Sequence, residues 1–123
     1  MALADIDVKA LVEAALIELP EPFKGSLGNL AVLVDDFPDD QVRQRFSGNI
    51  LGLYRGVPNS RRTLGQSGVP PSIIYIYAQP ILDYCTKTGS DITEVIQSVL
   101  IHEIGHHFGF NDEEIYRIEI SEN

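Results

Sequence analysis

The spacing of apolar residues divides the chain into helical and extended segments. Apolar residues recur every three to four positions over residues 4–19, which predicts an amphipathic helix that ends at Pro20. Three short apolar runs, over residues 29–34, 49–56 and 72–79, have the length and the β-branched content of strands. The second of these runs is short, and we expect it at the edge of a sheet.

Two further helices are predicted towards the C-terminus. Residues 80–89 favour a short helix that its terminal glycine closes. Asp91 followed by Glu94 is a variant of the capping box, which predicts the start of another helix that runs to about Phe108. Apolar residues surround this helix almost completely, so we expect it at the centre of the protein. The Gly-, Pro- and Ser-rich residues 56–72 predict a long surface loop.

The composition is that of one globular domain. The chain has 123 residues, a mass of 13.6 kDa and 44% hydrophobic residues, which suits a single domain over residues 1–123 with one core. No run approaches the roughly 20 apolar residues of a membrane span. The only cysteine, Cys85, excludes an internal disulfide, and we expect it to be a small buried residue. The N-terminal helix lacks the basic start of a signal peptide, so we expect a cytoplasmic protein.

The negative net charge of the protein restricts the kinds of partner that it can bind. The formal net charge is −9 and the sequence pI is about 4.6. Such a surface repels phosphate backbones and anionic lipids, which argues against nucleic acid and membrane surfaces as partners. It favours cations, either metal ions or basic peptide segments. The four aspartates within residues 35–40 lack the ligand order and the closing glutamate of an EF-hand, so we do not expect a calcium site there.

The candidate chemistry lies in HEIGHHFGFND, residues 102–112, which contain all three histidines of the chain. His102 and His106 are four residues apart and therefore share one face of the predicted helix. Two imidazoles at this spacing can bind one zinc ion at about 2.0–2.1 Å each. Glu103 is rotated by about 100° from His102, so it flanks the metal as a general base for a water molecule.

A third ligand is needed, because catalytic zinc sites usually have three protein ligands and one open position. Gly109 can end the helix with a positive φ and turn the chain back towards the metal. Asp112 follows three residues later, and a carboxylate oxygen is an acceptable zinc ligand. Glu113 and Glu114 are close to the turn and Glu119 faces an unknown side, so we favour Asp112.

These motifs resemble those of known zinc peptidases. The pattern HExxHxxGxxD is similar to the extended motif of the metzincins, with an aspartate at the position of their usual third histidine. HEIGHHFGFNDEEI together with LGLYRGVP (51–58) resembles more closely the minimal zincins, a family of small bacterial metallopeptidases, from about Leu30 onward. The resemblance implies an α+β, zincin-like fold, in which a small mixed sheet packs on a central active-site helix that carries the motif. It also implies that a peptide substrate adds as an extra strand to an exposed sheet edge.

The function predicted from these residues is that of a zinc-dependent peptidase. His102, His106 and Asp112 bind Zn²⁺, and Glu103 is the catalytic general base that activates water for attack on a peptide bond. The sequence also departs from the metzincins, since its only methionine is Met1 and only eleven residues follow Asp112, too few for the usual C-terminal subdomain. One alternative is therefore a non-catalytic, zincin-like metal-binding module with a regulatory or interaction role. Another is a homodimer in which the partner supplies the missing wall of the cleft.

The third histidine and the tyrosines are further candidates for roles near the motif. His107 lies about 100° from His106 around the helix, so it cannot easily share the metal, and we expect a surface or supporting residue. A tyrosine could donate a hydrogen bond to the developing oxyanion, but nothing singles one out, and we expect the tyrosines in the core or on a sheet face. The candidates of this type are Tyr54, Tyr75, Tyr77 and Tyr116.

Overall fold

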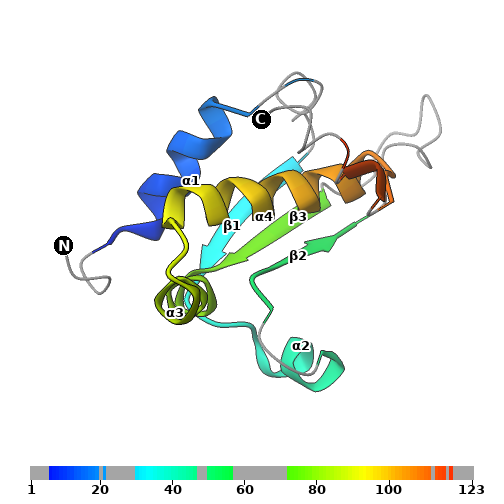
Figure 1. Cartoon of the computed structure of the whole chain (residues 1–123). Helices are drawn as coiled ribbons and strands as arrows, with labels where there is room; N and C mark the ends of the chain where they lie inside the picture. Colours follow the sequence, from blue (N-terminus) through cyan, green and yellow to red (C-terminus); the bar gives the residue numbers. More distant parts are fainter. Residues whose placement is uncertain are drawn as a thin grey trace.

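The structure is a computed structural model, and it describes residues 6–19, 21, 30–46, 50–56, 72–111, 113–115 and 117. Helices and strands form an α+β arrangement, as predicted (Figure 1). The elements are α1 (Val8–Ile17), β1 (Leu30–Asp35), α2 (Asp40–Arg45), β2 (Gly52–Arg55), β3 (Ser72–Tyr77), α3 (Ala78–Thr88) and α4 (Ile92–His107). Most of the predicted loop over residues 56–72 lies outside the described residues.

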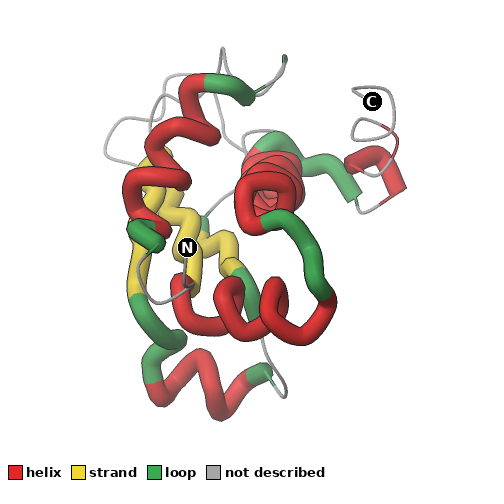
Figure 2. The backbone as a smooth tube through the Cα atoms, turned by 60° about the vertical axis from the view of Figure 1, so that its left-hand side comes forward, coloured by secondary structure: helices red, strands yellow, loops and turns green. Residues whose placement is uncertain are grey.

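The three strands form a mixed sheet in the order β1-β3-β2. β1 is parallel to β3, whereas β2 is antiparallel to β3 and lies at the edge, as its short length predicted. In the register of the sheet, Leu33 and Leu53 lie on either side of Tyr75. Helices α1 and α4 lie over one face of this sheet (Figure 1), and Figure 2 views α4 nearly along its axis with the strands to one side of it.

Helix α4 supplies the centre of the hydrophobic core, as its apolar pattern predicted. It packs against α1, α3, β2 and β3. Ile96, Leu100 and Ile104 of this helix are fully buried, and so are Ile74 and Ile76 of β3, which project towards it. Burying one such side chain contributes about 1.5–3 kcal/mol relative to leaving it in water. The alternation of β3, with these two isoleucines on the inner face, therefore positions α4 on the sheet.

Aspartate side chains fix where three of the helices begin. Asp7 accepts a hydrogen bond from the Ala10 N–H at the start of α1, and Asp91 accepts one from the Glu94 N–H at the start of α4. The cap at Asp7 explains why α1 begins later than the predicted residue 4. Asp39 caps α2, a helix that the sequence analysis did not predict, because it has six residues and buries only Val42.

The boundary between β3 and α3 differs from the prediction. The strand ends at Tyr77 and the helix begins at Ala78, two residues earlier than predicted. Pro80 is compatible with the first turn of α3. The N–H groups of a first turn have no acceptor within the helix, so the N–H that proline lacks is not missed. At its other end α3 closes as predicted, at Gly89 with a φ of 73° and its N–H bonded to the Cys85 carbonyl.

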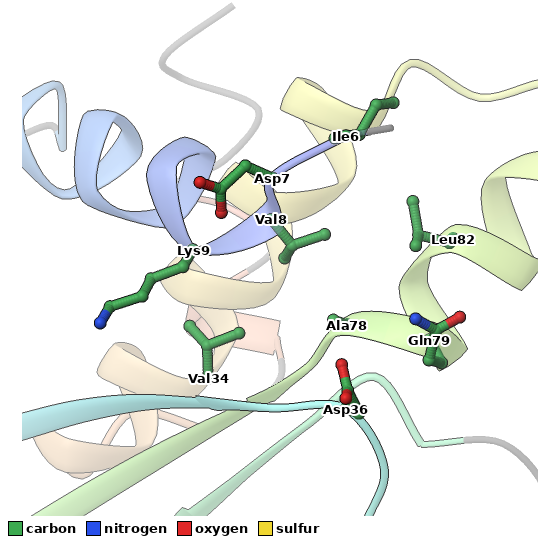
Figure 3. A pocket seen from close by; sticks show the side chains of 9 residues that line it. All are labelled: Ile6, Asp7, Val8, Lys9, Val34, Asp36, Ala78, Gln79 and Leu82. Carbon is green, nitrogen blue, oxygen red and sulfur yellow. The ribbon is translucent and has the colours of Figure 1, made fainter. Parts of the chain in front are cut away.

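A hollow of about 390 Å³ lies between the start of α1, the end of β1 and the start of α3 (Figure 3). Its wall combines apolar side chains such as Val8, Val34 and Leu82 with the polar groups of Asp36 and Gln79. None of the described residues that line it belongs to α4, so the hollow is separate from the histidines. No helix in the described ranges is long and apolar enough to cross a bilayer.

The segment after α4 packs back onto the helix at Gly105. Ile115 is 1% exposed, and a Cβ at Gly105 would stand 2.5 Å from its Cγ1 and 2.7 Å from its Cδ1. A glycine inside a helix costs about 1 kcal/mol relative to alanine. The close approach of Ile115 explains why the helix has a glycine at this position.

We expect Gly105→Ala to lower the free energy of unfolding by about 1–3 kcal/mol, because the added methyl group overlaps Ile115. Ile115→Ala removes both overlapping atoms, so Gly105→Ala should cost less in that background, or even stabilise the helix. Urea unfolding of the two single variants and the double variant measures this coupling. Equal effects of Gly105→Ala in both backgrounds would contradict the packing explanation.

Candidate metal centre

The last turn of α4 ends in a Schellman motif at Gly109. Gly109 has a φ of 85°, and its N–H donates to the His106 carbonyl at 2.9 Å. The Phe110 N–H donates to the Gly105 carbonyl at 3.0 Å. These two bonds define the motif and reverse the chain direction after the helix. The structure thus confirms the predicted helix end and the left-handed glycine.

The two histidines that the sequence placed on one face converge in the structure. The Nε2 atoms of His102 and His106 are 3.2 Å apart, and both side chains are partly exposed. Two nitrogen ligands at 2.0–2.1 Å from one ion, separated by a tetrahedral angle, stand about 3.3 Å apart. The spacing of these nitrogens and the imidazole chemistry therefore fit a shared zinc ion.

Glu103 lies on the side of α4 that faces the edge strand β2. A Cβ added at Gly52 of β2 would stand 2.7 Å from Cγ1 of Val99 and 3.5 Å from Cγ of Glu103. Val99, Glu103 and His107 follow one another at intervals of four residues and so lie along one side of α4. This side of the helix faces β2, and the glycine allows the strand to approach it closely.

The third predicted ligand, Asp112, lies outside the described residues. Within the described part of the chain, no three His, Cys, Asp or Glu side chains form a metal-binding group, so the complete ligand set remains a prediction. Asn111 accepts from the Glu114 N–H at 2.9 Å and donates its own N–H to the Glu114 carboxylate at 3.1 Å, which forms a capping box. Glu113 pairs with Arg117, so both nearby glutamates have local partners.

His107 is not a surface residue, and that part of the prediction is wrong. Its side chain is fully buried, and its Nδ1 lies 3.1 Å from the Tyr54 hydroxyl. The same hydroxyl donates to Oγ of the buried Ser72 at 3.0 Å. Sequence reasoning missed this network. Two signals in the sequence were available. His107 follows Glu103 by four residues, and Tyr54 follows Gly52 by two residues and therefore shares the inner face of β2 with it.

Three of the candidate tyrosines, Tyr54, Tyr75 and Tyr77, lie in the strands of the sheet. Tyr54 projects towards α4, where its hydroxyl is already engaged with His107 and Ser72. Tyr75 lies on the opposite face of the sheet, with the Arg55 guanidinium 5.5 Å from its ring centroid. Tyr116 lies outside the described residues.

Burial shifts the pKa values of two further groups. Tyr77 is 2% exposed, and burial raises the pKa of its phenol, as do the nearby carboxylates of Asp39 and Asp35. Cys85 is buried as predicted, and burial also raises the pKa of its thiol, with a smaller contribution from Asp91. Both groups therefore stay protonated at neutral pH, and the thiol is not an activated nucleophile.

The comparisons with known proteins assign the family. The family model for zincin-like metallopeptidases matches residues 27–122. The chain belongs to this family. A solved structure of a conserved hypothetical protein from T. thermophilus is similar in fold, with a TM-score of 0.52 and 24% identity over 82% of this chain and 90% of that chain. No curated protein matches. The small mixed sheet with its helices fits the zincin-like fold.

Gly109→Ala and Gly89→Ala form a matched pair, because both glycines end a helix with a positive φ. We expect each substitution to lower the free energy of unfolding by about 1 kcal/mol, the usual cost of a Cβ in the left-handed region. Only Gly109→Ala should also weaken the binding of added Zn²⁺, since its turn follows the histidines of this zincin-like metallopeptidase. Thermal unfolding and zinc titration measure the two effects. Equal zinc affinity of the two variants would rule out a role for this turn in the metal site.

Proposed function

We propose that this zincin-like metallopeptidase is a zinc-dependent peptidase with His102, His106 and Asp112 as metal ligands. The observation that carries the proposal is the 3.2 Å separation of the two histidine Nε2 atoms on α4, in a chain of this family. The turn at Gly109 supports Asp112 as the third ligand, because it returns the chain after the helix. The local partners of Glu113 and Glu114 make those two residues weaker candidates.

Each residue of the proposed site has a defined task. Zinc, when bound, supplies a Lewis acid that polarises the peptide carbonyl and makes a water molecule more acidic. Glu103 accepts the proton of the attacking water and returns it to the leaving amine. His102 and His106 present their Nε2 atoms on one helix face, and Asp112 adds the negative charge that stabilises a divalent cation.

The edge strand β2 is the proposed docking site for the peptide substrate. Its other edge pairs with β3, and no further strand adjoins it within the described part of the sheet. A peptide that adds here forms backbone hydrogen bonds with β2, and these bonds select an extended conformation rather than particular side chains. Because Glu103 lies on the side of α4 that faces β2, this docking would present a peptide bond beside the proposed base.

The proposed compartment is the cytoplasm. Cys85, the one cysteine of the chain, is buried and unpaired, which suits a reducing environment. The net charge of −9 gives an acidic protein that attracts cations, including basic peptides, and repels nucleic acids.

Metal analysis and peptide hydrolysis together test the zinc peptidase proposal. We expect one zinc per chain in the native protein, loss of that zinc in His102→Ala, and retained zinc in Glu103→Gln. Glu103→Gln should lower kcat by about 10²–10⁴-fold, because it keeps the shape of the side chain and removes its basicity. Glu94→Gln, in the first turn of the same helix, is the matched control and should leave kcat unchanged.

Two outcomes would contradict the proposal in different ways. If the native protein binds no zinc after purification and reconstitution, the proposed metal site is wrong. Stoichiometric zinc without hydrolysis of any member of a peptide library, in monomer or dimer, would instead favour a non-catalytic metal-binding module.

Asp112→Asn tests the third ligand separately. We expect its zinc affinity to fall by about 100-fold or more, because loss of a direct ligand should cost more than the 10–100-fold typical of supporting residues. Glu113→Gln, Glu114→Gln and Glu119→Gln are the matched controls and should bind zinc like the native protein. Competition with a colorimetric chelator measures all four variants. A larger loss in any glutamate variant than in Asp112→Asn would identify a different third ligand.

A further inference from the structure

A buried polar cluster joins the edge strand to the last turn of α4. It consists of Tyr54 on β2, Ser72 on β3 and His107 on α4. The Tyr54 hydroxyl lies 3.0 Å from Ser72 Oγ and 3.1 Å from His107 Nδ1. The rings of Tyr54 and His107 also meet edge to face, with their centroids 5.7 Å apart. We refer to these three residues as the tyrosine latch.

The burial of the latch makes its hydrogen bonds specific. Ser72 and His107 are each 0% exposed, and their polar groups are therefore costly to bury unless they are hydrogen-bonded. The Tyr54 hydroxyl donates to Ser72 Oγ, and its contact with His107 Nδ1 is the second hydrogen bond of the latch. A change in the position of α4 relative to β2 would break these bonds inside the protein. The latch thus favours one alignment of the helix and the strand.

The place of the latch connects it to the proposed metal site. His107 follows His106 directly and lies one turn after Glu103 on the side of α4 that faces β2. Gly52, two residues before Tyr54, packs closely against Val99, and a Cβ there would stand 3.5 Å from Cγ of Glu103. These contacts lie along one side of α4, and together they align β2 with the part of α4 that carries the proposed ligands and base.

We propose that Tyr54 is a positioning residue for the metal site and that it acts through His107. Its hydroxyl holds the last turn of α4 against β2 and so fixes the geometry of His106 and of the turn at Gly109. The effect on zinc binding rests on the proposed function, whereas the effect on the helix end does not. Tyr54 takes no part in proton transfer, because its hydroxyl is engaged within the latch.

Tyr54→Phe tests the latch with little change in packing, because it removes only the hydroxyl group. In the metal-free protein we expect the amide protons of Gly109 and Phe110 to exchange about 10-fold faster, since the last turn opens more often without the latch. The amide proton of Leu100, in the middle of the same helix, should keep its exchange rate. A general loss of stability would instead accelerate exchange at all three positions, so hydrogen exchange followed by NMR separates positioning from global destabilisation.

The second measurement is zinc affinity by chelator competition. Tyr54→Phe should bind zinc about 10-fold more weakly, in the lower part of the range seen for supporting residues of metal sites. The Co²⁺-substituted variant should show a changed visible spectrum, because the ligand geometry changes. Tyr75→Phe is the matched control, since it removes a hydroxyl on the opposite face of the sheet, and it should behave like the native protein in every measurement.

Ser72→Ala provides an independent test if Tyr54→Phe does not fold. It removes the far partner of the latch, and we expect the same local increase in exchange at Gly109 and Phe110. Unchanged exchange at both positions in the folded variant, or uniform acceleration that includes Leu100, would overturn the proposal.

If the native protein binds no zinc, the proposed function fails, but the exchange rates still decide whether the latch holds the helix end. If it binds zinc and Tyr54→Phe keeps the native affinity, the latch does not position the metal site.

Discussion

The close contact between α4 and the edge strand β2 is the constraint on which the rest of the structure depends. The isoleucines and the leucine of helix α4 are buried in the core. The polar residues of this helix therefore have to lie on its remaining sides. Gly52 permits the contact, because a Cβ there would overlap Val99 and crowd the carbonyl oxygen of Tyr75 at 3.1 Å. The histidine pair and Glu103 are consequently held beside a sheet edge.

The second constraint is the way in which α4 ends. The Schellman motif at Gly109 and the packing of Ile115 on Gly105 direct the chain back across the helix. A family match over residues 27–122 includes this whole segment. Asp112 follows this turn by three residues and is the proposed third ligand.

Sequence reasoning predicted the elements with strong local signals. The Asp91 cap, the closing Gly89 and Gly109, and the alternation of β3 follow from short-range chemistry, and each was found as expected. Helix α2 was not predicted, because six mostly polar residues carry almost no periodic signal.

The candidate site was predictable where it depends on residues that are close in the sequence. The spacing of His102 and His106 predicted the pairing of their Nε2 atoms, since it depends only on helix geometry. The burial of His107 was not predictable in this way, because it depends on Tyr54 and Ser72, which lie 53 and 35 residues earlier in the chain.

The ligand set of the zinc-loaded protein, determined by crystallography, tests the proposed metal site most directly. We expect one zinc ion bound by His102 Nε2, His106 Nε2 and a carboxylate oxygen of Asp112, with a fourth position next to Glu103 that water occupies. A fourth protein ligand in that position, or an ion that does not contact both histidines, would contradict the proposal.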